Sequence, residues 1–287
     1  MDVYARKCCV VCNIAFGPET KKLHCSRCQE KSGIACYCSR SCQRRHWPAH
    51  KIVCFDVKTT PIVRIDAAAE GKTIASIQAA IDGAPAGAAI IIPEGRFKAS
   101  EDDDDKETVL CINKPIKILG DGIGRTMLEC DFHVLGNKNT SSSLVIARLA
   151  VEGTIEVDVS PDDAYSAVTF LAVRAVPRLG IEGSALSGNK FQIKSFPEKE
   201  LLLLACEIIG GEDGVVIEIG ARDASVIIQE TEISHAKYRG IFASAPFILK
   251  NSKVHSCGAY GIKGRVGWHE VGNNEVQPGP WSPRPSY

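Results

Sequence analysis

The sequence predicts a mostly β protein in which a small metal-binding module precedes a solenoid of short strands. Cysteine is crowded before Phe55, whereas from Ile62 onward short runs of Val, Ile and Leu alternate with turn residues. Several of the later runs also resemble one another at a repeating spacing, as expected of a solenoid. With 287 residues the chain has room for two separately cored units.

The metal module is predicted from eight residues with ligand spacing: Cys9, Cys12, Cys25, Cys28, Cys38, Cys42, His50 and Cys54. Two Cys-x-x-Cys pairs are followed by a Cys-x-x-x-Cys pair and a His-x-x-x-Cys pair, and the last spacing places both ligands on one helical face. Four thiolate or imidazole ligands complete a structural zinc site. We therefore expect two structural zinc ions, with Cys8 as an alternative to Cys9 and Cys36 as an alternative to Cys38.

The stretch YCSRSCQRRHWPAHKIVC at residues 37–54 resembles the end of a MYND-type zinc finger. This resemblance covers about residues 9 to 54 and implies cross-bracing of the two zinc sites. One site would use Cys9, Cys12, Cys38 and Cys42, and the other Cys25, Cys28, His50 and Cys54. The spacing alone does not establish which pairs share an ion.

The same resemblance implies a surface for a protein partner. MYND modules that bind short proline-containing peptides use the zinc-bound hairpin and the following helix, and the matching positions here are Ser26, Gln43 and Trp47. An indole offers a flat apolar face to a proline ring, and the two polar side chains can bond to peptide backbone. The alternative is that Trp47 packs beneath the helix as part of a small core.

Internal repeats predict the architecture of the second unit. The runs at 201–208, 226–233 and 247–254 place their apolar residues at coincident positions, with weaker copies at 144–151 and 169–176. Each of the three stronger copies is followed by a Gly and an aliphatic residue: Gly214-Val215, Gly240-Ile241 and Gly261-Ile262. β-Branched residues and short runs argue against a helical solenoid, so we expect a right-handed parallel β-helix.

A short helix is predicted at the start of this unit, over residues 73–82. Ile74, Ile77 and Ile81 fall on one helical face, Thr73 is an N-cap and Gly83 a stop. With the strands expected near residues 89–95 and 114–120, this order resembles the first coils of pectin-lyase-like β-helix proteins, over about residues 62–266. The helix is expected to cover the open N-terminal end of the solenoid.

We therefore expect three regions: a zinc finger at 1–58, a β-helix at 59–266 and a disordered, proline-rich tail at 267–287. The acidic run at 101–106 is interpreted as a loop, because consecutive carboxylates repel one another.

Charge and cysteine usage limit the possible partners and compartments. Lys plus Arg and Asp plus Glu each number 34, so a formal net charge of zero supplies no global attraction to nucleic acid or anionic membrane. No membrane span or signal peptide is predicted, and an odd total of 13 Cys favours metal thiolates in the cytoplasm or nucleus over a disulfide framework.

These features predict a non-enzymatic adaptor whose finger binds a proline-containing partner and whose β-helix is a scaffold or a ligand-binding surface. No catalytic residue is assigned, since Glu212 and Asp213 are adjacent and Glu218, Asp223, Glu230 and Glu232 with His235 and His255 match the ordinary polar surface of a solenoid. One competing hypothesis is a carbohydrate-active β-helix recruited by its finger. The other is a nucleic-acid regulator using Arg44 and Arg45, for which we find no base-reading pattern.

Overall fold

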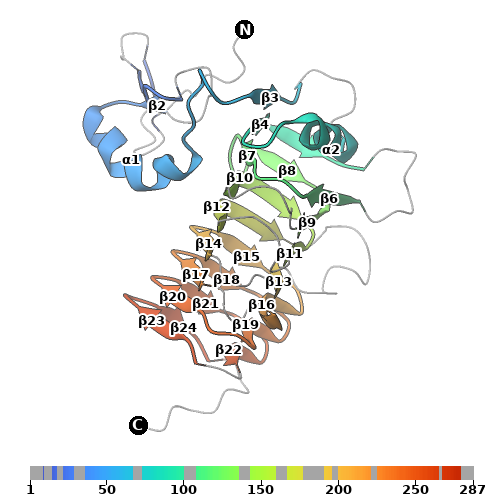
Figure 1. The fold of residues 1–287 in the computed structure, drawn as a ribbon. Coiled ribbons are helices and arrows are strands. Elements are labelled where there is room, and N and C mark those ends of the chain that lie inside the picture. Colours follow the sequence, from blue (N-terminus) through green and yellow to red (C-terminus); the bar gives the residue numbers. More distant parts are fainter. Residues whose placement is uncertain are drawn as a thin grey trace.

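A computed structural model describes residues 9, 15–17, 22–28, 36–66, 73–99, 108–135, 143–159, 167–176, 191–195, 200–220, 225–264 and 267–278. The finger lies beside the first coils of a long stack of strands (Figure 1). The predicted fold class is confirmed: the protein is mostly β, with a zinc-binding N-terminal module and a β-helix. Cys8, Cys12, Asp223, the acidic run at 101–106 and residues 279–287 of the tail predicted at 267–287 lie outside the described residues. Within that predicted tail, residues 269–271 and 275–276 form strands that pair with the β-helix, so the stack of strands extends past residue 266.

The finger consists of a small hairpin and a helix. Strands β1 (Leu23–His24) and β2 (Cys36–Tyr37) pair antiparallel. Helix α1 (Arg40–Val53) starts after Ser39, whose side chain accepts a hydrogen bond from the Cys42 N–H at 3.2 Å, as an N-cap does. The helix ends where the Cys54 N–H donates to the His50 carbonyl at 2.9 Å.

Parallel strands stack into a large branched sheet. Its main path runs through β3 (Ile62–Arg64), β4 (Ala89–Ile92), β7 (Lys117–Gly120), β10 (Leu144–Glu152), β12 (Ala167–Val176), β14 (Glu200–Leu204), β17 (Ser225–Gln229), β20 (Ile248–Lys250) and β23 (His269–Val271). The long strands β10 and β12 continue into a second wall formed with β5 (Gly95–Phe97), β8 (Thr126–Leu128), β15 (Glu207–Ile209), β18 (Glu232–Ser234), β21 (Lys253–His255) and β24 (Glu275–Val276).

A separate sheet closes the coil. Its seven strands among the described residues are β6 (Val109–Ile112), β9 (Asp131–Leu135), β11 (Ile155–Asp158), β13 (Phe191–Ser195), β16 (Asp213–Gly220), β19 (Arg239–Ala243) and β22 (Tyr260–Gly264). All its pairings are parallel. Successive strands of one sheet therefore belong to successive coils, as in a β-helix.

The strand registers confirm the strongest predicted repeats. Leu201 pairs with Val226, and the pairing of Ile227 with Ile248 continues the same alignment one coil further. The weaker copy predicted at 169–176 begins one residue too late, because Val168 rather than Thr169 pairs with Leu201. A one-residue shift exchanges the inward and outward faces of a strand, so this correction decides which side chains enter the core.

Each of the three stronger runs, at 201–208, 226–233 and 247–254, is divided between two strands, whereas the weaker copies at 144–151 and 169–176 lie in the single strands β10 and β12. The chain bends at Ala205, Glu230 and Asn251, whose φ angles of 52°, 52° and 47° lie in the left-handed region. Such angles turn the backbone sharply and are uncommon outside glycine. The bend directs the second half of each run into the next wall of the solenoid.

Inward-facing aliphatic and aromatic residues fill the solenoid. Along the main sheet they stack coil upon coil as Ile90, Ile118, Ile146, Phe170, Leu203, Ile228 and Leu249, all fully buried. The predicted capping helix is confirmed as α2 (Ile74–Gly83) at the N-terminal end (Figure 1). Its Ile74, Ile77 and Ile81 are buried in this same core, and the Thr73 hydroxyl caps it.

A second apolar cluster joins the finger to the outside of the solenoid. Val53 and Phe55 follow the zinc-binding helix and are buried against outward-facing residues of the first coils: Ala89, Ile91, Leu119, Val145, Ala147 and Leu171. The finger is therefore packed on the wall of the β-helix. Among the described residues, no helix is both long and apolar enough to cross a membrane.

Candidate metal centre

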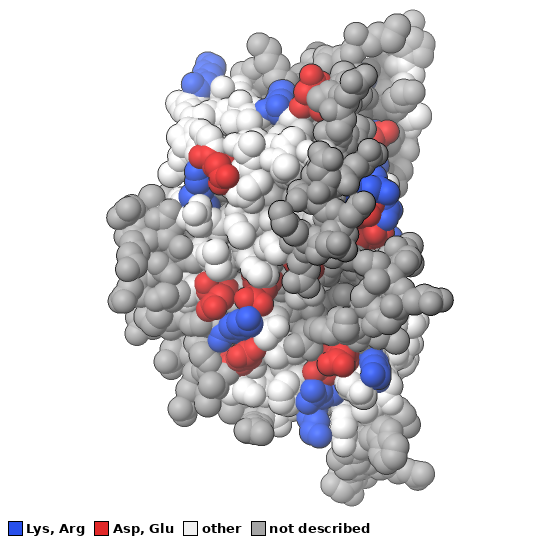
Figure 2. Space-filling model, turned by 90° about the vertical axis from the view of Figure 1, so that its right-hand side faces the viewer, with Lys and Arg blue, Asp and Glu red and all other residues white. Residues whose placement is uncertain are grey.

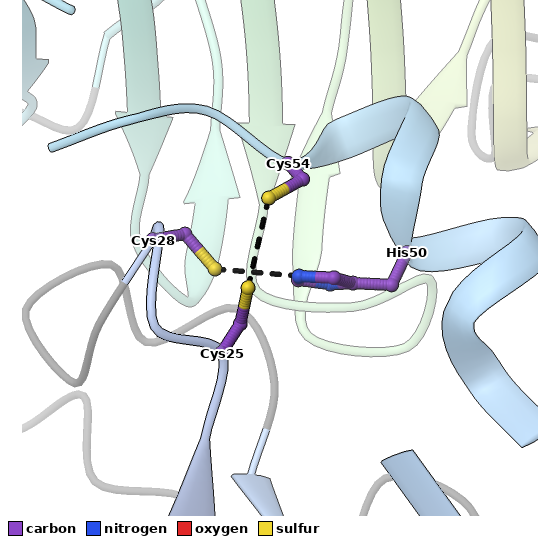
Figure 3. A group of neighbouring side chains, drawn as sticks. All are labelled: Cys25, Cys28, His50 and Cys54. Atoms are coloured by element: carbon purple, nitrogen blue, oxygen red, sulfur yellow. Dashed lines mark hydrogen bonds between the residues drawn. The ribbon is translucent and has the colours of Figure 1, made fainter. Parts of the chain in front are cut away.

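Four predicted ligands meet in a buried cluster. Cys25 and Cys28 come from the turn after β1, and His50 and Cys54 come from the end of α1 (Figure 3). Their donor atoms all lie within 4.8 Å of one another. The Cys25 and Cys54 sulfurs are 3.7 Å apart, and Cys28 Sγ is 3.3 Å from His50 Nε2. Tetrahedral zinc with 2.3 Å Zn–S bonds separates two sulfurs by roughly 3.8 Å, so this donor set fits zinc.

The pKa shifts of His50 and Cys25 favour metal ligation, whereas burial raises the pKa of the Cys54 thiol. Burial lowers the pKa of His50 to about 4, with help from His46 and Lys117, so the imidazole is neutral at pH 7. Burial alone would raise the pKa of the Cys25 thiol, but backbone hydrogen bonds from Cys28 and Arg27 leave that pKa below its usual value. A neutral imidazole and an accessible thiolate are the forms in which these side chains bind zinc.

Three predicted ligands form a second cluster. Cys9 is buried beside Cys38 and Cys42, with the latter two sulfurs 3.6 Å apart and all three within 4.8 Å. Cys12, the fourth predicted ligand, lies outside the described residues. Cys36, the alternative to Cys38, instead faces His24 Nδ1 at 3.6 Å. Along the chain, Cys9 precedes Cys25 and Cys28 of the other cluster, and Cys38 and Cys42 precede His50 and Cys54, so the two sites interleave.

The predicted partner residues lie next to the buried cluster. Trp47 on α1 is 43% exposed, so it does not pack beneath the helix as the alternative proposed. Gln43 Nε2 donates to the His24 carbonyl of β1 at 3.5 Å, and Ser26 is exposed in the turn that follows β1. Gln43 and Ser26 therefore lie where α1 and the hairpin meet, and Trp47 lies on α1 beside His50.

Lys117 from the β-helix also reaches the metal centre. Its Nζ donates to the carbonyls of Ile52 and Cys54 at 3.2 and 2.6 Å. Burial lowers the pKa of Lys117, against the attraction of Cys54. Sequence reasoning missed this residue, because nothing in the chain near position 117 indicates that it contacts residues more than sixty positions earlier.

Several of the solenoid groups considered for catalysis are held by hydrogen bonds to neighbouring side chains. Asp213 is buried and accepts two hydrogen bonds from Arg239, at 2.7 and 2.6 Å. His255 bonds to Glu232 at 2.9 Å. Their positions on different walls of the coil do not bring Asp213 and Glu232 to a common site.

A charged cluster on the seven-stranded sheet was not predicted. Lys194 Nζ lies 2.8 Å from Glu156 Oε1, and its pKa is raised by that hydrogen bond and by the nearby charges of Glu156, Asp158 and Glu218. Glu218 also accepts a hydrogen bond from Gln192 at 2.5 Å. Figure 2 shows the right-hand side of the view in Figure 1, where small groups of acidic and basic side chains lie among uncharged ones. The members come from three different coils, so no local motif could reveal the cluster.

The family of the N-terminal module follows from these ligands. The protein-family model described as MYND finger matches residues 9–54, the segment that holds both clusters. Residues 9–54 form a MYND zinc finger. Both clusters of this MYND finger have the ligand chemistry of zinc. No curated protein sequence matches the chain.

Solved structures match the β-helix. ORF18 of Geobacillus virus E2 is 11% identical with a TM-score of 0.53, covering 82% of this chain. This chain spans only 50% of the viral protein. The A-modules of the Azotobacter vinelandii mannuronan C-5 epimerases AlgE6 and AlgE4 are 14% and 15% identical, with TM-scores of 0.40 and 0.38. Their alignments cover 73% and 70% of this chain and 73% and 72% of theirs.

The epimerase modules correct one expectation. The chain was expected to have no enzymatic activity, but these structural neighbours of its β-helix are enzymes. The expectation that the chain has no enzymatic activity is therefore not retained. Because one fold carries many activities, the activity itself has to be argued from a site.

Proposed function

We propose that the MYND finger of this chain binds a proline-containing peptide of a partner protein across Trp47, Gln43 and Ser26. MYND fingers are protein-interaction modules, and the exposed indole of Trp47 is the observation that carries the finer assignment. An aromatic face exposed beside polar groups is the usual receptor for a proline ring in an extended peptide. The proposed compartment is the cytoplasm or nucleus, where thiolates remain reduced.

The neighbours of Trp47 support this assignment. Its ring lies 5.8 Å from that of His50, so the indole rests against a residue of the buried cluster. Gln43 ties α1 to β1 through the His24 carbonyl. The surface is therefore held in place by elements that the metal organises, which limits the entropy lost on binding a peptide.

Two structural zinc ions are part of the proposal. The first would be held by Cys9, Cys12, Cys38 and Cys42, and the second by Cys25, Cys28, His50 and Cys54. Four protein ligands at each ion leave no open position for water or substrate. Their role is to fold a finger with few core residues and thereby to position Trp47.

An array of synthetic proline-containing peptides tests the binding surface. Full-length Trp47→Ala is expected to lose capture by about tenfold or more, because buried aromatic anchors dominate such interfaces. Trp268→Ala is the matched control, since Trp268 is 36% exposed but lies on the β-helix near Phe247. Zinc content should be the same in both variants. Equal capture by wild type and Trp47→Ala would show that this surface is wrongly assigned.

A second candidate function is activity on a polysaccharide at the seven-stranded sheet. The observation that favours it is the cluster of Glu156, Asp158 and Glu218 around Lys194 on an outward face. When a cation lies between neighbouring carboxyl groups, one group can stay ionised and act as a base while another stays protonated and acts as an acid. Glycoside hydrolysis requires such a pair. The cluster carries more carboxylates than cations, which favours a neutral polysaccharide over an acidic one.

Turnover of a polysaccharide panel that contains neutral glycans and mannuronan tests this candidate. Activity that is lost in Glu156→Gln and kept in Glu275→Gln would support it. Glu275 is the matched control because it also pairs with a lysine, Lys253, but on another wall of the coil. Activity unchanged in Glu156→Gln would rule out the cluster as its site.

A further inference from the structure

Lys117 occupies an apolar row on the outside of the solenoid. Its partners in register on the adjacent strands are Ala89 and Val145, and both are buried under the finger. An ammonium group in such surroundings is destabilising unless acceptors replace the water it loses. The acceptors in the described residues are the carbonyls of Ile52 and Cys54, at 3.2 and 2.6 Å.

These carbonyls belong to the end of helix α1. The last carbonyls of a helix have no partner within it, and they form the negative end of the helix dipole. Lys117 donates to one carbonyl on each side of Val53, the last residue of α1. A cation from the β-helix therefore completes the helix terminus of the finger.

The same terminus carries two ligands of the buried cluster. His50 and Cys54 are one turn apart and are joined by the backbone hydrogen bond from the Cys54 N–H to the His50 carbonyl, at 2.9 Å. Fixing the carbonyls of Ile52 and Cys54 fixes the backbone from which both ligands project. Groups that orient metal ligands in this way commonly change metal affinity by about 10- to 100-fold.

Charge adds to the orienting effect. Zinc bound by three thiolates and one neutral imidazole has one net negative charge. Lys117 is attracted to Cys54 and Cys28, two of the three thiol ligands. Lys117 is partly buried beside the apolar cluster that contains its register neighbours Ala89 and Val145, and this partial exclusion of water strengthens the attraction.

We propose that Lys117 of the β-helix is a positioning residue of the Cys25, Cys28, His50 and Cys54 zinc centre, and that it couples zinc retention in the finger to the first coils of the solenoid. The finger and the β-helix then behave as one unit at this contact. Any peptide held by the finger would have a fixed orientation relative to the sheets.

Zinc release from the full-length, zinc-loaded protein into an excess of a chromophoric chelator tests the first half of the proposal. In Lys117→Met, one of two release phases is expected to accelerate about tenfold, while the other is unchanged. Lys117→Arg retains a donor and should restore most of the retention. Lys114→Met is the matched control, because Lys114 Nζ caps carbonyls of Asp82 and Ala84 at the end of α2, away from the zinc centre.

Unchanged release of zinc from Lys117→Met would overturn the proposal, and so would equal acceleration in Lys117→Met and Lys114→Met.

Hydrogen exchange of the wild type gives an answer that does not depend on how a variant folds. Removing zinc with the chelator should speed exchange at the amides of β4 and β7 and leave those of β20 and β22 unchanged. Identical exchange at β4 and β7 with and without zinc would also overturn it.

Discussion

The ring of Trp47 lies 5.8 Å from the ring of His50 at an angle of 46°, so an exposed indole contacts a ligand of the buried cluster. This contact joins the proposed partner surface to the metal. It also makes Trp47 a reporter of the state of the second zinc centre, because loss of the ligand arrangement frees the indole.

Zinc removal should therefore change the fluorescence of Trp47. The chain has three Trp, and a variant with Trp268→Phe and Trp281→Phe isolates the signal. We expect chelation to shift its emission to longer wavelength as α1 unfolds, because the finger has too small a core to fold without metal. Constant emission after complete zinc removal, measured in the same sample, would mean that the finger keeps its structure without metal.

Acid should weaken the finger through His50. The pKa of His50 is lowered by burial from 6.5 to about 4, so the unfolded chain takes up this proton more readily than the folded one. The contribution to stability is fully present above pH 6.5 and is lost as the pH falls toward 4. In the zinc-loaded protein, ligation adds to this effect, because a proton on His50 also has to displace zinc. The urea midpoint of the helical signal of α1 should therefore fall as the pH drops below 6.5. A midpoint that does not depend on pH between 6.5 and 4 contradicts the assignment.

Gly240 is required by the close approach of neighbouring coils. A Cβ added there would lie 2.2 Å from Val254 Cγ1 and 2.7 Å from the Gly261 carbonyl oxygen. Gly240→Ala is expected to destabilise the β-helix by about 2 kcal/mol, because overpacking displaces a buried neighbour. Gly267→Ala is the control, since no atom lies within 4 Å of its added Cβ. Denaturant unfolding gives the midpoint of each variant. Equal midpoints would show that neighbouring coils can move apart at Gly240 with little loss of stability.

The buried pair of Asp213 and Arg239 should be costly to break from one side. The Asp213 side chain is only 5% exposed, so Arg239→Met leaves a buried carboxylate without its partner. We expect a loss of about 2 kcal/mol, less than for a fully buried pair because Arg239 is 26% exposed. The double variant with Asp213→Leu should recover most of this loss. Equal stability of the single and double variants in denaturant would argue against this pairing.

Sequence patterns predicted the features that are local or periodic. The ligand spacing of His50 and Cys54 depends on one helical turn, and the alignment of Leu201 with Val226 depends on repeated apolar positions. Both kinds of information are present in short stretches of chain. The weaker copy near Thr169 was misplaced by one residue, because strand periodicity alone does not specify register when neighbouring residues are also apolar.

Other features depend on contacts between distant coils and could not be predicted. Lys117 has the sequence context of an ordinary strand residue, and only the packing of α1 on β7 gives it two carbonyl partners. Lys194 and Glu156 meet because their strands are adjacent in the stack, although a long stretch of chain separates them. The sequence likewise could not predict whether Trp47 is buried or exposed, since an indole suits both a small core and a binding surface.

The amount of zinc bound per folded chain is the most direct test of the account, because both the proposed partner surface and its link to the β-helix depend on two interleaved sites. Metal analysis of purified protein should find two zinc ions in the wild type and one in each of Cys25→Ser and Cys42→Ser. A single zinc in the wild type, or two in either variant, would contradict the assignment of these ligands.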